Sequence, residues 1–192
     1  MRVIAGSLKG RRLASPGWSG LRPTSDRLRE TLFNVLAPRV QEARVLDLYA
    51  GTGALGIEAA SRGARAVVLV ERDRRAQALI GQNLEHCGLA ASPEALGGAG
   101  GGCAIIRATA ARALEMLRGP DVAPFDIVLL DPPYDQAPAA ALDGVEAVVA
   151  PDGLVVLEHA TRTPAPERVG RLVKYRDLPS GDSTLSFYAH SG

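Results

Sequence analysis

The chain has 192 residues, of which 46% are hydrophobic and 22% charged, a composition typical of one globular domain with a single core. Its formal net charge is +1, so neither a strongly acidic nor a strongly basic protein is indicated overall. It holds no run of roughly 20 apolar residues that could cross a membrane, and its first residues lack the apolar stretch of a signal peptide, so we expect a cytoplasmic protein with no membrane partner.

The first forty residues are unlike the rest in charge. They hold eight basic and two acidic side chains, a net charge of +6, whereas the remaining 152 residues carry −5. We predict that residues 1–40 form a basic hairpin and helix, a small extension on a domain over residues 41–192. Such a surface would attract a phosphate backbone, although charge alone is explained equally well by solvated residues.

After residue 40, short apolar runs alternate with helical stretches. The pattern predicts strands at 44–49, 66–71, 103–107, 125–130 and 153–158. It predicts helices at 54–62, 74–87, 110–117 and 137–149. Nearly continuous apolar strands separated by helices are typical of a mostly parallel sheet covered on both faces, so we expect a doubly wound, Rossmann-like α/β fold.

Two segments depart from this alternation. The glycine-rich residues 95–102 precede a strand rather than a helix, so we predict a flexible surface loop with no catalytic role. Residues 171–176 and 184–188 alternate in polarity around Pro179-Ser-Gly-Asp182, which predicts a hairpin. The sheet should therefore end in an antiparallel C-terminal hairpin.

A glycine-rich turn follows the first predicted strand. Gly51, Gly53 and Gly56 have the spacing G-x-G-x-x-G, and Glu71 ends the next strand. Gly51 and Gly53 would let the backbone turn tightly beside a ligand, Gly56 would allow close helix–strand packing, and Glu71 would accept hydrogen bonds from ribose hydroxyls. The spacing alone leaves NAD, FAD and S-adenosylmethionine open as cofactors.

Asp47 lies inside the apolar strand, four residues before Gly51. A carboxylate here would repel the pyrophosphate of a dinucleotide but would favour the ammonium and sulfonium groups of S-adenosylmethionine. An alternative is that Asp47 is a buried polar group that caps the loop.

The motif Asp131-Pro132-Pro133-Tyr134 directly follows the predicted strand at 125–130, at the sheet edge where ligands bind. The two prolines make a rigid loop, and the Asp131 side chain and Pro132 carbonyl can both accept hydrogen bonds from one amino group. This arrangement would make an exocyclic base amine more nucleophilic toward a sulfonium methyl, while Tyr134 stacks on the extruded base. We therefore predict methyl transfer to a base amine.

These motifs together resemble the amino-group methyltransferases that act on DNA adenine or RNA guanine. Three further segments narrow the resemblance: RVIAGSLKGRRL at 2–13, LRPTSDRLRETLF at 21–33 and GDSTLSFY at 181–188. With them, essentially the whole chain resembles the bacterial 16S ribosomal RNA guanine-N2 methyltransferases of the guanine-966 type. A DNA adenine-N6 methyltransferase is the alternative, but it usually needs a separate target-recognition region.

The resemblance implies a class I methyltransferase with a seven-stranded sheet, S-adenosylmethionine as cofactor and 16S ribosomal RNA as substrate, in an assembled or assembling small subunit. It implies catalytic roles for Asp131, Pro132, Pro133 and Tyr134. It implies cofactor contacts by Asp47, Tyr49, Gly51, Gly53, Glu71, Arg72 and, more weakly, Thr109, because an acidic residue that relatives often have is replaced here by Arg107-Ala-Thr-Ala110. The predicted RNA-binding residues are Lys9, Arg11, Arg12, Arg22, Arg27 and Arg29.

Other residues are assigned structural roles. We expect His159 to be structural, because a methylated guanine amine loses its proton without a dedicated base. The cysteines Cys87 and Cys103 lack metal-site spacing, so we predict structural thiols and no metal. Trp18 would either stack on RNA or pack a loop.

Two other functional classes remain as alternatives. A nicotinamide oxidoreductase would leave Asp131–Tyr134 unexplained, and a non-enzymatic RNA-binding module would leave the cofactor turn unexplained. We expect a monomer by default.

Overall fold

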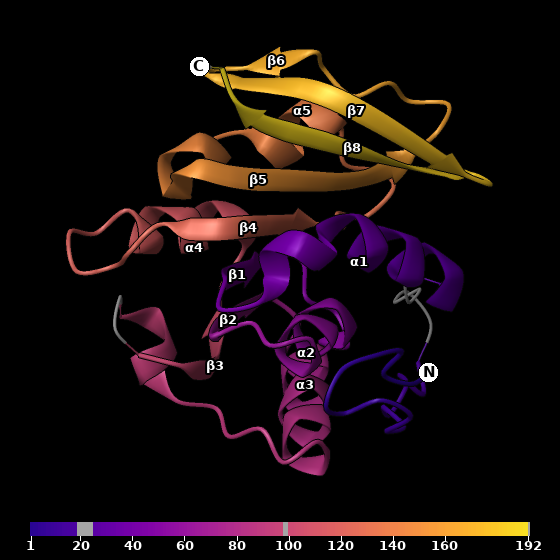
Figure 1. The fold of residues 1–192 in the computed structure, drawn as a ribbon, viewed down its shortest axis with the longest axis vertical. Coiled ribbons are helices and arrows are strands. Elements are labelled where there is room, and N and C mark those ends of the chain that lie inside the picture. The colour runs from indigo at the N-terminus through magenta and orange to yellow at the C-terminus, as the bar shows by residue number, and fades with distance from the viewer. Residues whose placement is uncertain (19–24, 98–99, 192) are drawn as a thin grey trace.

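A computed structural model describes residues 1–18, 25–97 and 100–191 and contains one mixed sheet (Figure 1). In the described residues the sheet has eight strands in the order β3-β2-β1-β4-β5-β8-β7-β6. The strands are β1 (Arg44–Asp47), β2 (Ala66–Glu71), β3 (Gly102–Arg107), β4 (Phe125–Leu130), β5 (Val149–Ala160), β6 (Arg168–Val169), β7 (Leu172–Ser180) and β8 (Ser183–His190). The helices are α1 (Asp26–Val40), α2 (Ala54–Ser61), α3 (Arg74–His86), α4 (Ala110–Leu117) and α5 (Pro138–Leu142), with 3-10 turns η1 (Pro93–Leu96) and η2 (Val145–Val148).

Strands β1 to β5 are parallel and carry helices on both faces. On one face α1, α2 and α3 share a core with alternate strand residues such as Val45, Leu69 and Ile127. On the other face α4, α5 and η2 pack against residues such as Leu46 and Val128. Burial on both faces explains why these strands are apolar throughout, and it confirms the predicted doubly wound arrangement. The chain order reverses between β1 and β4, where such sheets bind ligands.

The C-terminal part is antiparallel, as the sequence predicts. β8 pairs with both β5 and β7, and β7 and β8 are joined through Gly181, whose φ of +63° favours glycine. The predicted count of seven strands was wrong for the described residues, because Arg168 and Val169 pair with Val173 and Leu172 as the short strand β6. Two residues are too few to show a strand periodicity in the sequence.

The predicted helix over 137–149 was also wrong in its extent. α5 ends at Leu142, and Gly144 takes a left-handed conformation with φ +72° before the short turn η2. Val149 already belongs to β5 and pairs with Phe125. Gly144 divides the segment because a left-handed residue cannot continue a right-handed helix.

Residues 95–97 of the predicted surface loop at 95–102 are held to the body of the protein. Ala95 is fully buried, and the Arg44 guanidinium donates hydrogen bonds to the carbonyls of Ala95, Leu96 and Gly97 at 3.3, 3.1 and 2.6 Å. The expectation of a flexible surface loop was therefore wrong for residues 95–97, while residues 98 and 99 lie outside the described part of the chain. No local sequence pattern indicates this contact, because Arg44 is about fifty positions away.

The basic N-terminal segment packs on the same core as α2. Val3, Leu13, Leu28 and Phe33 are buried there, and Arg2 pairs with Arg12 in an antiparallel bridge. Helix α1 begins after Ser25, whose hydroxyl accepts a hydrogen bond from the Leu28 N–H at 3.2 Å and so caps the helix. The division at residue 40 stays a prediction. In the described part of the chain, no helix is long and apolar enough to span a bilayer.

Candidate active site

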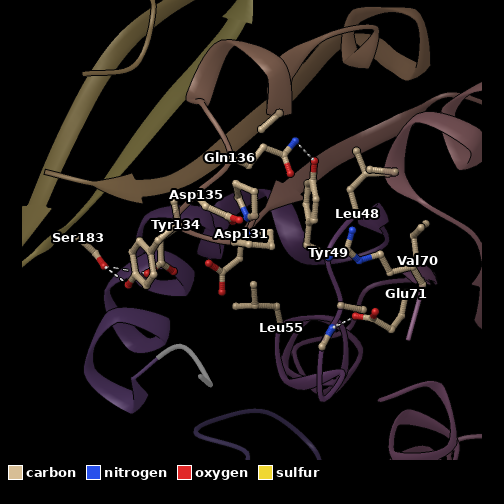
Figure 2. A pocket seen from close by; sticks show the side chains of 18 of the residues that line it. Leu48, Tyr49, Leu55, Val70, Glu71, Asp131, Tyr134, Asp135, Gln136 and Ser183 are labelled. Atoms are coloured by element: carbon tan, nitrogen blue, oxygen red, sulfur yellow. Dashed lines mark hydrogen bonds between the residues drawn. The ribbon is translucent and has the colours of Figure 1, made fainter. Parts of the chain in front are cut away.

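A cleft of about 1400 Å³ opens at the carboxyl ends of the parallel strands. Its walls come from the segments that follow β1, β2, β3, β4 and β5, together with the β7–β8 turn. Figure 2 shows Glu71 on one side of this cleft and Asp131, Tyr134 and Ser183 together on the other. The sheet topology therefore brings the predicted cofactor turn and the predicted catalytic loop to one cavity.

The glycine turn forms the wall next to β1. Gly51 has φ +54° and Gly53 has φ +80°, conformations that favour glycine. A Cβ on Gly56 would lie 2.8 Å from the Leu69 side chain, so this glycine permits the close packing of α2 on β2. Gly51 lines the cleft, whereas Gly53 lies behind it against Ile80 and Leu69. Gly53 therefore determines the backbone path of the turn but does not itself face the cleft.

Glu71 fixes the position of the turn from the end of β2. Its two carboxylate oxygens accept hydrogen bonds from the Gly51 N–H at 3.0 Å (Figure 2) and from the Asp73 N–H at 2.8 Å. Each oxygen keeps a second lone pair, and both the side chain and neighbouring Arg72 line the cleft. Glu71 can thus accept further hydrogen bonds from a bound ribose.

Asp47 is fully buried beneath the turn and does not line the cleft. One of its oxygens accepts a hydrogen bond from the Gly56 N–H at 3.2 Å, and the other has no hydrogen-bond partner among the described residues. Burial, reinforced by the charge of Asp131, raises the pKa of Asp47 to about 7. This geometry matches the alternative in which Asp47 caps the loop, and a direct cofactor contact stays a prediction.

Tyr49 and Thr109 line the cleft from two other strand ends. The Tyr49 hydroxyl accepts a hydrogen bond from the Gln136 amide at 2.8 Å, which links the end of β1 to the loop after Tyr134 (Figure 2). Burial raises the pKa of Tyr49, so it stays protonated at neutral pH. Thr109 caps α4 by accepting from the Arg112 N–H at 3.3 Å, and its hydroxyl proton is left to donate to a ligand.

The Asp131–Tyr134 loop forms the opposite wall. The Pro133 carbonyl accepts from the Gln136 N–H at 2.9 Å, which closes a tight turn after the two prolines. The Tyr134 side chain is 57% exposed, so its ring face is open to a ligand. Its hydroxyl lies 3.2 Å from the Ser183 hydroxyl (Figure 2), and the Ser183 hydroxyl donates to the Glu158 carboxylate at 2.9 Å.

Sequence reasoning missed three residues of this wall: Gln136, Glu158 and Ser183. The sequence could have indicated Glu158 in the same way as Glu71, because both are acidic residues at the end of a predicted apolar strand. No sequence pattern indicates Ser183 as a site residue, since only the antiparallel pairing of β5 with β8 brings it to the cleft.

The predicted RNA-binding residues fall into three groups. The side chains of Lys9, Arg11, Arg12 and Arg27 are exposed, and Arg11 also donates to the His86 carbonyl at 3.1 Å. Arg22 lies outside the described residues. The prediction that Arg29 binds RNA was wrong, because this side of α1 faces the core and Arg29 is fully buried. Its guanidinium is ion-paired to Asp26 at 2.9 Å and donates a hydrogen bond to the Arg2 carbonyl.

The remaining residues have the local contacts expected of structural groups. His159 is buried and bonded to the Ser186 hydroxyl and the Thr163 carbonyl, both at 2.8 Å, which fits the structural role that the sequence predicts. Cys87 and Cys103 are buried free thiols, as expected. Trp18 lines the cleft with the Arg75 guanidinium 5.1 Å above its ring, so both roles considered for it remain open.

Comparison with known proteins finds relatives that are named as ribosomal RNA methyltransferases. The "Putative rRNA methyltransferase YlbH" of Bacillus subtilis is 35% identical over 196 residues, which cover the whole of both chains. The "Ribosomal RNA small subunit methyltransferase D" of Haemophilus influenzae is 39% identical over 135 residues, 70% of this chain and 64% of that protein. Its namesake in Escherichia coli is 51% identical over 84 residues, 44% of this chain and 42% of that protein.

Solved structures agree on the fold. The Escherichia coli structure titled "Putative methyltransferase yhhF" matches with a TM-score of 0.80 and 32% identity, covering 100% of this chain and 98% of that one. The hypothetical protein TTHA0928 of Thermus thermophilus matches with a TM-score of 0.81 and 28% identity, covering 98% and 99%. The predicted Rossmann-like methyltransferase fold is therefore confirmed.

A family model described as "Conserved hypothetical protein 95" matches residues 1–189. This match spans both the basic N-terminal segment and the C-terminal hairpin, as does the full-length likeness to the Bacillus subtilis protein. The chain therefore belongs to this family, that of the small-subunit ribosomal RNA methyltransferases D.

Proposed function

We propose that this protein transfers a methyl group from S-adenosylmethionine to the exocyclic N2 amine of a guanine in 16S ribosomal RNA, the guanine-966 type of reaction. The observation that carries the proposal is the rigid Asp131–Tyr134 loop, which faces the glycine turn across one cleft. The relatives named as small-subunit ribosomal RNA methyltransferases support the choice of RNA. We expect a cytoplasmic monomer that acts on RNA in a small-subunit particle.

The residues around the glycine turn fit S-adenosylmethionine. Gly51 offers backbone without a side chain, Glu71 offers acceptors for ribose hydroxyls, and Tyr49 and Thr109 offer flanking polar groups. Asp47 holds the turn from behind through the Gly56 N–H, and the Glu71 carboxylate in the same wall favours a cationic ligand over a pyrophosphate. When bound, the cofactor supplies an electrophilic methyl group on its sulfonium.

The opposite wall fits the acceptor base. The Asp131 carboxylate and the Pro132 carbonyl accept the hydrogens of the amine and turn its lone pair toward the cofactor side of the cleft. Tyr134 presents a ring face on which a flipped base stacks. An amine that has gained a methyl group is more acidic, and Asp131 or water would take its surplus proton. Positioning and electrostatics carry the catalysis.

The experiment that tests this function compares small-subunit RNA from cells with and without the gene. Mass mapping should show one N2-methylguanine missing in the deletion strain and restored by the wild-type gene. The purified protein should also bind S-adenosylmethionine and not NAD. An unchanged RNA modification pattern, or methylation of DNA adenine by the purified protein, would contradict the proposal.

A further inference from the structure

The wall that would hold the acceptor base contains a second carboxylate beside Asp131. β4 and β5 are parallel, and Leu130 pairs with Leu157, so Asp131 and Glu158 are the next residues on two adjacent strands. Neighbouring strands lie about 4.8 Å apart, so the backbones of these two residues are adjacent at the carboxyl end of the sheet. Both line the cleft together with Tyr134.

Glu158 is held firmly in this position. It is only 7% exposed, and the Ser183 hydroxyl donates to its Oε1 at 2.9 Å while also lying 3.2 Å from the Tyr134 hydroxyl. The same hydrogen-bond chain therefore fixes the carboxylate and the ring on which the base would stack. A buried carboxylate is expensive to desolvate, and in a site for polyanionic RNA it repels phosphates, so its presence there favours a ligand that brings hydrogen-bond donors to it.

The bases differ in the donors on their pairing edges. Guanine presents N1–H and the N2 amine side by side, both donors, whereas adenine presents N1 as an acceptor beside its N6 amine. Two neighbouring carboxylates match two neighbouring donors, but the second carboxylate would repel the N1 lone pair of adenine. A site built to accept a hydrogen bond rejects a substrate that lacks the donor more strongly than an apolar pocket does.

We propose that Glu158 selects guanine: its carboxylate accepts the N1–H of the flipped base while Asp131 and the Pro132 carbonyl hold the N2 amine. This inference rests on the proposed function and adds the residue that distinguishes guanine from other purines with an exocyclic amine. Ser183 is a positioning residue in this arrangement, because it holds Glu158 and Tyr134 without touching the base.

The test replaces the target guanine by 2-aminopurine, which keeps the N2 amine but has N1 as an acceptor. The wild-type protein should methylate the guanine substrate about 100-fold faster under single-turnover conditions. Glu158→Gln should lower the rate on guanine by about 100-fold and raise the rate on 2-aminopurine, because the glutamine amide donates to N1. The preference should therefore collapse or reverse. The substrate is small-subunit RNA with the single substitution, assembled into particles.

Two control variants separate recognition from structure. Ser183→Ala should slow both substrates alike and leave the preference for guanine unchanged, and the exposed Glu167→Gln should change neither rate. Unstacking of 2-aminopurine, followed by its fluorescence, should remain in Glu158→Gln.

The outcomes distinguish this inference from the proposed function. If Glu158→Gln slows the methylation of both substrates by the same factor, as Ser183→Ala should, Glu158 only supports the loop. The inference about Glu158 then fails, while the proposed function stands. If the wild-type protein methylates no guanine in small-subunit RNA, the proposed function fails, whatever the variants do.

Discussion

At the scale of single residues, the site depends on carboxylates that the strand ends bring close together. Asp47 and Asp131 lie at the ends of the adjacent strands β1 and β4, and the charge of Asp131 adds to burial in raising the pKa of Asp47 to about 7. Of these two aspartates, Asp131 lines the cleft and Asp47 does not. The two aspartates should therefore differ in role: Asp131 acts on the substrate, and Asp47 acts on the stability of the turn.

The role proposed for Asp131 predicts a loss of turnover without a loss of cofactor. Asp131→Ala removes an acceptor that orients the amine, so the single-turnover rate should fall by about 1,000-fold. The affinity for S-adenosylmethionine, measured by calorimetry, should stay within about threefold. Asp131→Asn keeps one acceptor oxygen and should retain an intermediate rate. Wild-type turnover in Asp131→Ala would remove this residue from the reaction.

The raised pKa of Asp47 predicts how stability depends on pH. Between about pH 4 and 7 the folded protein keeps the Asp47 proton while the unfolded chain loses it. This difference lowers the free energy of unfolding as pH rises through that window, by at most about 1.4 kcal/mol per pH unit, and has no further effect above pH 7. Asp47→Asn should lose less stability than the wild type between pH 5 and 8, as measured by denaturant unfolding.

The matched control for this measurement is Asp152→Asn, which changes an exposed aspartate in the same way. Its stability should follow the wild-type pH dependence. A wild-type slope in Asp47→Asn would show that the turn does not bury a protonated carboxyl group.

At the scale of elements, the N-terminal segment is tied to the helices behind the cofactor turn. The Glu58 carboxylate in α2 accepts from the backbone N–H groups of Ile4 and Ala5 at 2.8 and 3.0 Å. Asn83 in α3 accepts from the Ala14 N–H at 2.7 Å and donates to the Thr52 carbonyl at 2.9 Å. One side chain therefore joins the basic segment to the turn after β1.

Removing this link should destabilise the protein. Asn83→Ala leaves the buried Thr52 carbonyl and the part-buried Ala14 N–H without their partner, and the free energy of unfolding should fall by about 2 kcal/mol. The control Asn34→Ala removes an exposed asparagine from α1 and should change stability by less than about 0.5 kcal/mol. Equal stability of the two variants, measured by denaturant unfolding, would contradict the link.

Local patterns explain which elements could be predicted from the sequence. The apolar strands, the glycine turn and the Asp131–Tyr134 loop are continuous in sequence, and the rule that ligands bind at strand carboxyl ends brings the last two together. The buried position of Arg29 and the anchoring of residues 95–97 by Arg44 depend on contacts between distant segments. Helical periodicity also failed at Gly144, where one left-handed residue redirects the chain.

At the scale of the whole molecule, function requires the cleft and the basic surface to act on one RNA. The exposed Lys9, Arg11 and Arg12 lie on the N-terminal segment, which packs against α2 and α3 on the face of the sheet that also carries α1 (Figure 1). The anchors at Glu58 and Asn83 connect this segment to the helices that follow the glycine turn and β2. The positive charge is thus fixed relative to the cleft, whose walls include several carboxylates.

This arrangement predicts that the N-terminal charges contribute to RNA binding through phosphates. Replacing Lys9, Arg11 and Arg12 by Gln should raise the apparent KM for RNA while leaving the affinity for S-adenosylmethionine unchanged. In a plot of the logarithm of the RNA binding constant against the logarithm of the salt concentration, each lost phosphate contact should make the slope shallower by about one. The triple variant should therefore lose up to about three in this slope. The control replaces Arg168, Arg171 and Arg176 by Gln, which removes the same charge from the β6–β7 hairpin. If both triple variants lose the same slope, net charge alone attracts the RNA and the N-terminal segment has no specific place in the complex.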